Sequence, residues 1–337
     1  MIEMTKIPAI EMLETFHHIL LGRGMRNDKA FQCAEIFTNN SVDGIYTHGV
    51  NRFPRFIQNI DMGIVNVNAV PSLKNKYAAM EQWDGNLGPG PLNAIHATEM
   101  AIKLSRENGI ACIALSNTNH WMRGGTYGWH AAKAGFAFIG WTNTIANMPA
   151  WGSGDIRLGN NPLVMGLPFG DEAIVLDMAM SQYSYGAMEH AKMKGEILPV
   201  YAGYDKFGEL TKDPSTILES QRPLPVGFWK GAGLSLLLDL FASILSGGLA
   251  TYEITQKEIE SGLSQVFVVM DIERLGDHST ILQIIQNIIT DYHHSSALDE
   301  KTKITYPGER VLQTRKINLA DGIPVVKKIW DDINQLK

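Results

Sequence analysis

The chain has 337 residues, of which 45% are hydrophobic and 19% charged, and its formal net charge is -6. This is enough apolar material for one large domain or two interlocked ones, which argues against disorder as the main state. No run of lysine or arginine offers a basic stripe, so we expect no nucleic-acid partner. The cysteines, Cys33 and Cys112, are too few for a disulfide scaffold and fit a reducing cytoplasm.

The sequence shows no segment that we interpret as a targeting or membrane-spanning element. Its N-terminal stretch carries Glu3, Glu11 and Glu14 and has no small-residue cleavage site after an apolar run, unlike a signal peptide. The longest apolar stretch, residues 231–249, contains Asp239, and an aspartate at mid-bilayer is costly. We therefore expect a core helix there and no membrane partner.

The predicted elements begin with a helical region over residues 1–62, where apolar residues recur at spacings of three and four. Within it, a helix is predicted at 29–38, and the preceding Asn27 and Asp28 are suited to cap it. Residues 39–49 are polar and glycine-containing, so they predict an ordered loop that leads into another helix. The following segment, 69–84, is predicted to be irregular with short strand pieces.

From residue 81 onward, helical and strand-like segments alternate as in an α/β protein. No repeat or low-complexity linker divides the chain, so we predict an α/β cofactor-binding core at 81–296 with helical flanking regions at 1–80 and 297–337. The predicted helices span 91–108, 127–133, 230–246, 280–293 and 325–335, and the predicted strands span 110–116, 137–143, 162–167, 173–177 and 265–272.

The glycine-rich segment at 85–91, GNLGPGP, does not have the G-x-G-x-x-G spacing that binds dinucleotides between a strand and a helix. It also places prolines where donating N–H groups would be needed. We interpret it as a tight loop before a helix. A nicotinamide cofactor would therefore require a fold other than the Rossmann fold.

The first concentration of chemistry-bearing residues is the segment at 46–54, which contains His48, Gly49 and Arg52. A histidine beside a glycine can be approached closely by a ligand, and four residues place His48 and Arg52 on one side of a helical turn. Arginine binds a carboxylate through two hydrogen bonds, and a protonated imidazole can give its proton to a ketone oxygen. The pattern therefore suits a 2-oxo acid, although a loop histidine and a solvated arginine have the same pattern.

A second concentration, residues 116–125, follows the predicted strand that ends near Ser116 and contains His120. Ligands of α/β sheets bind beyond the carboxyl ends of strands, so this turn is a candidate site, and the alternative is a helix-capping loop. Further turns at 159–162, 176–179, 229–231 and 307–309 either present N–H groups to a cofactor or are only turns.

The spacing of histidines and carboxylates supports no metal site, because H-x-x-x-H and H-E-x-x-H are both absent. The sequence also lacks a G-x-S-x-G turn, which weakens a hydrolase interpretation. We therefore expect chemistry that uses neither a bound metal nor a serine nucleophile.

The order of the motifs is more informative than any one of them. The chain contains, in series, THGVNRFPRF, SNTNHWMRGGTYGW, GWTNTIANMPAWG, GNNPL, VLDMAMSQYSYG, FWKGAGLSLLLD and YPGER. This series resembles the second type of malate/L-lactate dehydrogenase family, which is unrelated to the Rossmann-fold lactate and malate enzymes. The resemblance spans nearly the whole chain.

The resemblance implies a mixed-sheet, non-Rossmann α/β fold with helical N- and C-terminal flanks. It also implies a homodimer, no metal, and NADH, or alternatively NADPH, bound near the subunit boundary. His48 falls on the family's proton donor, and Arg52 and His120 resemble its substrate-side residues. The implied cofactor contacts are Ala173, Ile174, Val175, Leu176, Asp177, Met178, Ala179, Trp229, Lys230, Gly308, Glu309 and Arg310.

The function that the resemblance implies is the reduction of a small 2-oxo sugar acid in the cytoplasm by hydride from the cofactor. His48 is expected to protonate the developing alkoxide, and Arg52 to hold the carboxylate. Alternatives within the family are malate, L-lactate or ureidoglycolate dehydrogenase. A non-catalytic sugar-acid binding protein on the same scaffold is an alternative of another class.

Overall fold

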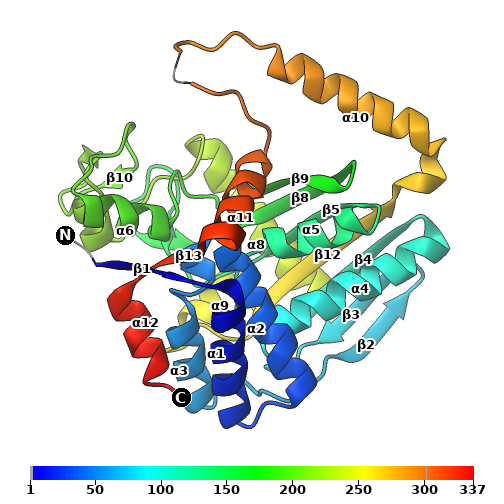
Figure 1. Ribbon diagram of the computed structural model, residues 1–337, viewed down its shortest axis with the longest axis horizontal. Coiled ribbons are helices and arrows are strands. Elements are labelled where there is room, and N and C mark those ends of the chain that lie inside the picture. The colour runs from blue at the N-terminus through cyan, green and yellow to red at the C-terminus, as the bar shows by residue number, and fades with distance from the viewer. Residues whose placement is uncertain (1–2, 301) are drawn as a thin grey trace.

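A computed structural model describes residues 3–300 and 302–337 of the chain. Its centre is a seven-stranded sheet in which only β3 and β4 pair in parallel, so the sheet is mixed. Figure 1 shows the sheet with helices packed around it. In spatial order its strands are β2 (Ser72–Tyr77), β3 (Met80–Asp84), β4 (Ile110–Thr118), β12 (Leu263–Asp271), β5 (Phe136–Thr142), β8 (Leu163–Phe169) and β9 (Glu172–Met178).

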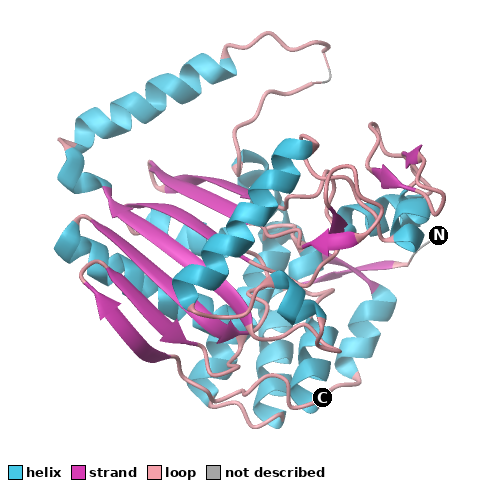
Figure 2. Cartoon of the chain, turned by 180° about the vertical axis from the view of Figure 1, so that it is seen from behind, coloured by secondary structure: helices cyan, strands magenta, loops and turns pink. Residues whose placement is uncertain are grey.

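The central strand β12 is covered on both faces, because alternate side chains of a strand point in opposite directions. Phe267 and Val269 join the large core that contains residues of α4 (Gly90–Asn108) and α5 (Gly125–Lys133). Val266, on the opposite face, packs with Ala242 of α8 (Trp229–Ser246). Figure 2 shows the face of the sheet that α8 crosses. Burial on both faces explains the continuous apolar run at residues 266–270 of β12.

The helices of the N-terminal region pack beside this sheet around aromatic side chains. Phe16 and Phe53 stack with ring centroids 3.9 Å apart. The elements of this region are α1 (Ala9–Gly22), α2 (Asn27–Val42), the 3-10 helix η1 (Tyr46–His48) and α3 (Phe53–Asp61).

The two ends of the chain meet in a small sheet that the sequence did not predict. The strand β1 (Met4–Ile7) pairs antiparallel with β13 (Ile323–Val326), and Figure 1 shows them side by side. The helix predicted at 325–335 therefore begins later, as α12 (Lys327–Asn334), because Val325 pairs with Thr5.

The remaining elements extend from this body. In Figure 1, α10 (His278–His293) projects away from the sheet, and a long loop then returns to α11 (Glu309–Asp321). The others are β6 (Met148–Pro149), β7 (Ile156–Leu158), α6 (Tyr185–Lys194), β10 (Gly203–Tyr204), β11 (Leu210–Thr211), α7 (Pro214–Ser220), α9 (Thr251–Thr255) and the 3-10 helix η2 (Ile272–Leu275).

The expected mixed-sheet α/β fold with helical flanks is confirmed. The division into a core at 81–296 and flanks at 1–80 and 297–337 stays a prediction. The strand β2 precedes residue 81, and it pairs with β3 in the large sheet.

Candidate active site

The loop that carries His48 is held tightly against α2. A Cβ on Gly49 would lie 2.2 Å from the Ser41 hydroxyl oxygen, so only glycine fits without a shift. The Val50 amide donates to that oxygen at 2.8 Å, and the Asn40 side chain donates to the His48 carbonyl at 2.9 Å. Gly49 therefore permits the close approach of α2. The sequence had instead suggested that this glycine lets a ligand approach His48.

The structure brings His48 and His120 together from two distant segments. Their imidazole rings are nearly parallel, 16° apart, with centroids separated by 5.8 Å. The Met122 amide donates to Nδ1 of His120 at 2.9 Å, so the neutral ring carries its proton on Nε2 and can donate from there. Nδ1 of His48 contacts the Thr47 hydroxyl at 3.2 Å.

Arg52 lies beside these rings and lines a shallow, solvent-open cleft together with His120. Arg52, Arg55 and Asn59 recur at spacings of three and four, so they share one side of α3. The cleft is lined by Arg52, Arg55, Phe56, Asn59, Val65, Asn119, His120, Met122, Ile259 and Glu260.

The positive charges of the site favour neutral imidazoles. Burial, together with the charges of Arg52 and Arg123, lowers the pKa of His48 to about 4. Burial and then Arg52 also lower the pKa of His120 well below its ordinary value. Both rings are therefore neutral near pH 7 in the protein without ligand.

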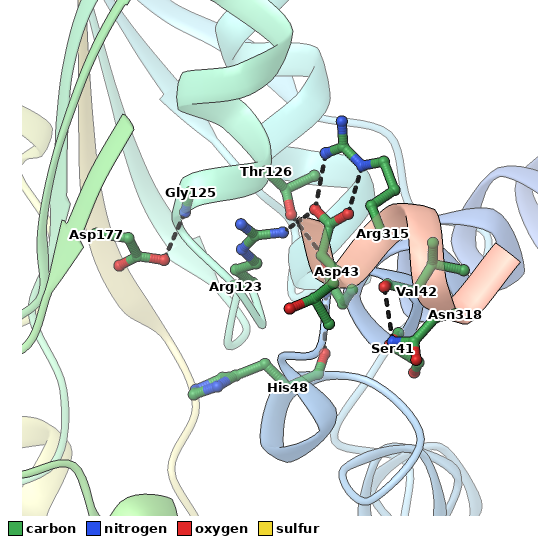
Figure 3. A network of polar contacts seen from close by, with 12 residues as sticks. Ser41, Val42, Asp43, His48, Arg123, Gly125, Thr126, Asp177, Arg315 and Asn318 are labelled. Atoms are coloured by element: carbon green, nitrogen blue, oxygen red, sulfur yellow. Dashed lines mark hydrogen bonds and ion pairs between the residues drawn. The ribbon is translucent and has the colours of Figure 1, made fainter. Parts of the chain in front are cut away.

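A buried ion network joins the segment before His48 to helix α11. Asp43, which is 6% exposed, accepts hydrogen bonds from Arg123 and from Arg315. The Thr126 hydroxyl donates to Asn40 at 2.7 Å, and Asn40 in turn holds the His48 carbonyl. Figure 3 shows this arrangement around His48. Sequence analysis identified neither Asp43 nor Arg315, because their contact joins segments far apart in the chain.

The residues predicted to contact the cofactor lie in neighbouring segments. The Val175 amide of the edge strand β9 donates to the Pro307 carbonyl at 3.0 Å, and Gly308, with φ of +97°, packs against Val175 and Trp129. After β9, the Met180 carbonyl accepts from Val226 at 2.7 Å, which places the start of α8 beside the end of the strand.

These segments contain groups that fit an anionic dinucleotide. Trp229 is 65% exposed and Lys230 is exposed at the N-terminus of α8, where backbone N–H groups favour a phosphate. The buried Ser181 hydroxyl near this turn makes no hydrogen bond in the described part of the chain.

Two of the predicted cofactor residues already have polar partners in the structure. Asp177 accepts from the Gly125 amide at 2.7 Å, and Figure 3 shows that contact. Glu309 contacts the His293 ring at 3.0 Å and accepts from the Tyr306 amide at 3.1 Å. Arg310 remains exposed on α11. Asp177 therefore has one carboxylate oxygen left for a ligand, while Glu309 also fixes α11 to α10.

The glycine-rich loop at 85–91 packs under the end of β4. A Cβ on Gly90 would lie 2.1 Å from the His120 carbonyl oxygen, and the Asn119 side chain donates to the Leu87 carbonyl at 2.8 Å. The loop thus supports the His120 segment and leads into α4, as the turn interpretation required. Among residues 3–300 and 302–337, no group of three or more potential ligands is arranged to hold a metal ion.

Comparison with known proteins identifies the class of protein that this fold and site define. The model of the malate/L-lactate dehydrogenase family matches residues 7–334, and the chain belongs to that family. The structure of malate dehydrogenase from Entamoeba histolytica superposes with a TM-score of 0.93 at 23% identity, covering 99% of this chain and 97% of that one. The chain is therefore an oxidoreductase, and the expected family is confirmed.

Curated relatives match over their full length. The chain is 41% identical to 2,3-diketo-L-gulonate reductase from Citrobacter koseri over 332 residues, which cover 98% of this chain and 100% of the relative. It is 40% identical, with the same coverage, to the enzyme of that name from Klebsiella pneumoniae.

Proposed function

We propose that this protein reduces 2,3-diketo-L-gulonate to 3-keto-L-gulonate, with NADH or NADPH as the reductant. The observation that carries the proposal is that the His48 ring faces the ring of His120, which lines one cleft with Arg52, because a 2-oxo acid needs a proton donor and a carboxylate partner. The relatives named as 2,3-diketo-L-gulonate reductases, at 40–41% identity over the whole chain, support this choice of substrate.

Each residue of the site has a separate role in the reaction. Arg52 holds the C1 carboxylate with its planar guanidinium and so fixes the position of C2. The nicotinamide, when bound, supplies the hydride that reaches C2. His48 gives a proton to the resulting alkoxide oxygen, while the Nε2–H of His120 donates a hydrogen bond to the same oxygen.

The low pKa of His48 determines when the proton is available. In the ligand-free protein, burial and the charges of Arg52 and Arg123 keep the ring neutral. A substrate carboxylate on Arg52 brings a negative charge that offsets this repulsion, so it raises the pKa of His48. Substrate binding therefore prepares the proton donor for the reduction. In the reverse direction the neutral ring is already a base.

The cofactor is proposed to lie along β9 and the start of α8. Lys230 and the first amides of α8 are suited to the pyrophosphate, and Asp177 has a free carboxylate oxygen for a hydroxyl. The segment at 308–310 completes this side of the site, because Gly308 packs on Val175.

A homodimer is proposed as the working form. By length and composition α8 alone, among the described helices, could cross a membrane, yet only 33% of it is buried. The expectation of a core helix therefore holds for one face of α8. Its other face exposes Leu236, Leu237, Leu240, Phe241 and Ile244, and an apolar patch of this kind marks a contact surface. Light scattering coupled to gel filtration reports the mass, and an active monomer would refute the dimer.

The assay that tests the proposal follows the absorbance of NADH and NADPH while the protein is mixed with a panel of 2-oxo acids. We expect consumption of reduced cofactor with 2,3-diketo-L-gulonate in a buffer near neutral pH that resembles the cytoplasm, the proposed location of the protein. A faster reaction with oxaloacetate or pyruvate would instead favour the malate or L-lactate dehydrogenase alternative. Reduction of NAD⁺ or NADP⁺ in a parallel mixture with ureidoglycolate would favour the ureidoglycolate dehydrogenase alternative. Binding without any turnover would favour the sugar-acid binding protein.

A further inference from the structure

The cleft that Arg52 and His120 line also carries charges of opposite sign. Glu260 lies between α9 and β12, and Arg55 and Asn59 lie on α3; all three line the cleft with Arg52. One carboxylate oxygen of Glu260 accepts from the Ile145 amide at 3.1 Å. That bond fixes the carboxylate at the cleft, so its position does not depend on a ligand.

The charges in the cleft act on one another without closing into a pair. Burial lowers the pKa of Arg52, while the charge of Glu260 raises it and that of Arg55 lowers it. In the described part of the chain, no ion pair within 4.0 Å joins Glu260 to either arginine. Opposite charges that line one cleft without pairing with each other can each bind a polar group of a ligand.

The orientation of the substrate determines what reaches these charges. When the C1 carboxylate binds Arg52 and C2 lies beside His48, the remaining carbons must extend along the cleft. Hydroxyl groups on those carbons can donate to the Glu260 carboxylate and accept from the Arg55 guanidinium or the Asn59 amide. A second carboxylate at the same place would instead meet the negative charge of Glu260.

We infer that Glu260, with Arg55 and Asn59, is the specificity-determining subsite for the tail of the substrate, and that it selects a neutral, hydroxylated tail over a carboxylate. The inference rests on the proposed function for its placement of the reacting carbon. It adds the residues that separate a sugar acid from a dicarboxylate such as oxaloacetate.

The test compares Glu260→Gln with the wild type on three substrates: 2,3-diketo-L-gulonate, pyruvate, which has no tail to bind, and oxaloacetate. Glutamine keeps a carbonyl oxygen for the Ile145 amide, so the loop should keep its shape. We expect kcat/KM to fall about 10-fold for the hydroxylated substrate and to change less than about twofold for pyruvate. The preference for oxaloacetate over pyruvate should rise by about 10-fold.

The matched control is Glu258→Gln, which removes the same charge from an exposed position two residues away on the same loop. It should leave kcat/KM for each of the three substrates within about twofold of the wild type, because exposed charges are screened. Equal changes on all three substrates in Glu260→Gln, or the same pattern in both variants, would overturn the inference.

A binding measurement separates this inference from the proposed function. In calorimetric titrations, L-gulonate, a hydroxylated acid, and succinate, a dicarboxylate, are the ligands. We expect Glu260→Gln to weaken L-gulonate and to strengthen succinate relative to the wild type. If this holds while no 2-oxo acid is reduced, the proposed function fails and the subsite stands. If both affinities are unchanged while the wild type reduces 2,3-diketo-L-gulonate, the subsite fails alone.

Discussion

Arg315 donates two hydrogen bonds to Asp43, from Nε at 2.7 Å and from Nη2 at 3.0 Å, across 272 residues of sequence. The same guanidinium lies over the Trp129 ring, 5.0 Å from its centroid. Asp43 also accepts from Arg123, whose positive charge lowers the pKa of His48. One carboxylate at the C-terminal end of α2 therefore joins α11 to the turn that precedes α5.

Replacement of Asp43 by asparagine should destabilise the fold strongly. The variant keeps the shape but leaves the Arg123 guanidinium, 6% exposed, without its counter-charge. Removal of one partner of a buried pair typically costs about 3–5 kcal/mol of the free energy of unfolding. Urea denaturation measures that loss. Asp61→Asn, at the half-exposed pair with Arg23, is the control and should cost at most about 1 kcal/mol.

The difference between this network and the predicted site residues shows what the sequence could reveal. His48, Arg52 and His120 lie in short motifs whose residue types match a reaction, so the local sequence is enough to predict them as site residues. Asp43 and Glu260 are single acidic residues in unremarkable loops, and only the folded chain brings them to their partners. No local pattern distinguishes them from solvated carboxylates.

The elements show the same limit. Strand β12 and helix α4 were predicted because burial imposes a long apolar run on one and regular spacing on the other. The strands β1 and β13 are four residues each and depend on one another, from opposite ends of the chain. The sequence of Val325 and Val326 therefore predicted a helix where a pairing partner imposes a strand.

Replacement of His48 by glutamine should lower the turnover number about 100-fold or more, the usual scale for loss of a general acid. The fold and cofactor binding should persist, because the Asn40 and Ser41 side chains hold the backbone of the loop and do not contact the ring through these bonds. Steady-state kinetics on the folded variant measure the change. His294→Gln, at an exposed position, is the control. Near wild-type turnover in His48→Gln would remove His48 from the mechanism.

The pH dependence should differ between the two directions of the reaction. Reduction requires protonated His48, whose pKa in the free protein is about 4. Above that pH the protonated fraction falls as pH rises, so kcat/KM for reduction should fall toward about 10-fold per pH unit. Oxidation requires the neutral ring, so its kcat/KM should be level over the same range.

The apparent pKa of His48 should be higher in the pH profile of kcat than in that of kcat/KM. The reason is that kcat reports the substrate complex, in which the bound carboxylate raises the pKa of His48. Profiles recorded between about pH 5 and pH 8 distinguish the two. If kcat/KM for reduction is independent of pH over that range, the proton comes from another group or its transfer does not limit the rate.

Arg52→Lys should separate the carboxylate contact from the rest of the site. Lysine keeps the positive charge but loses the planar fork, so kcat/KM for 2-oxo acids should decrease by an equivalent of about 1.5–3 kcal/mol, while the affinity for NADH barely changes. The corresponding methyl ester is the matched substrate, and the variant should lose less against it because the ester carries no charge for the fork to bind. Arg157→Lys, a substitution at an exposed position, should change kcat/KM for neither the acid nor the ester.

An equal loss for acid and ester, or a loss mainly in NADH affinity, would make Arg52 a structural or cofactor residue. The substrate carboxylate would then have to bind another cation. Arg55, which lines the same cleft, is the candidate, because Arg123 is already paired with Asp43.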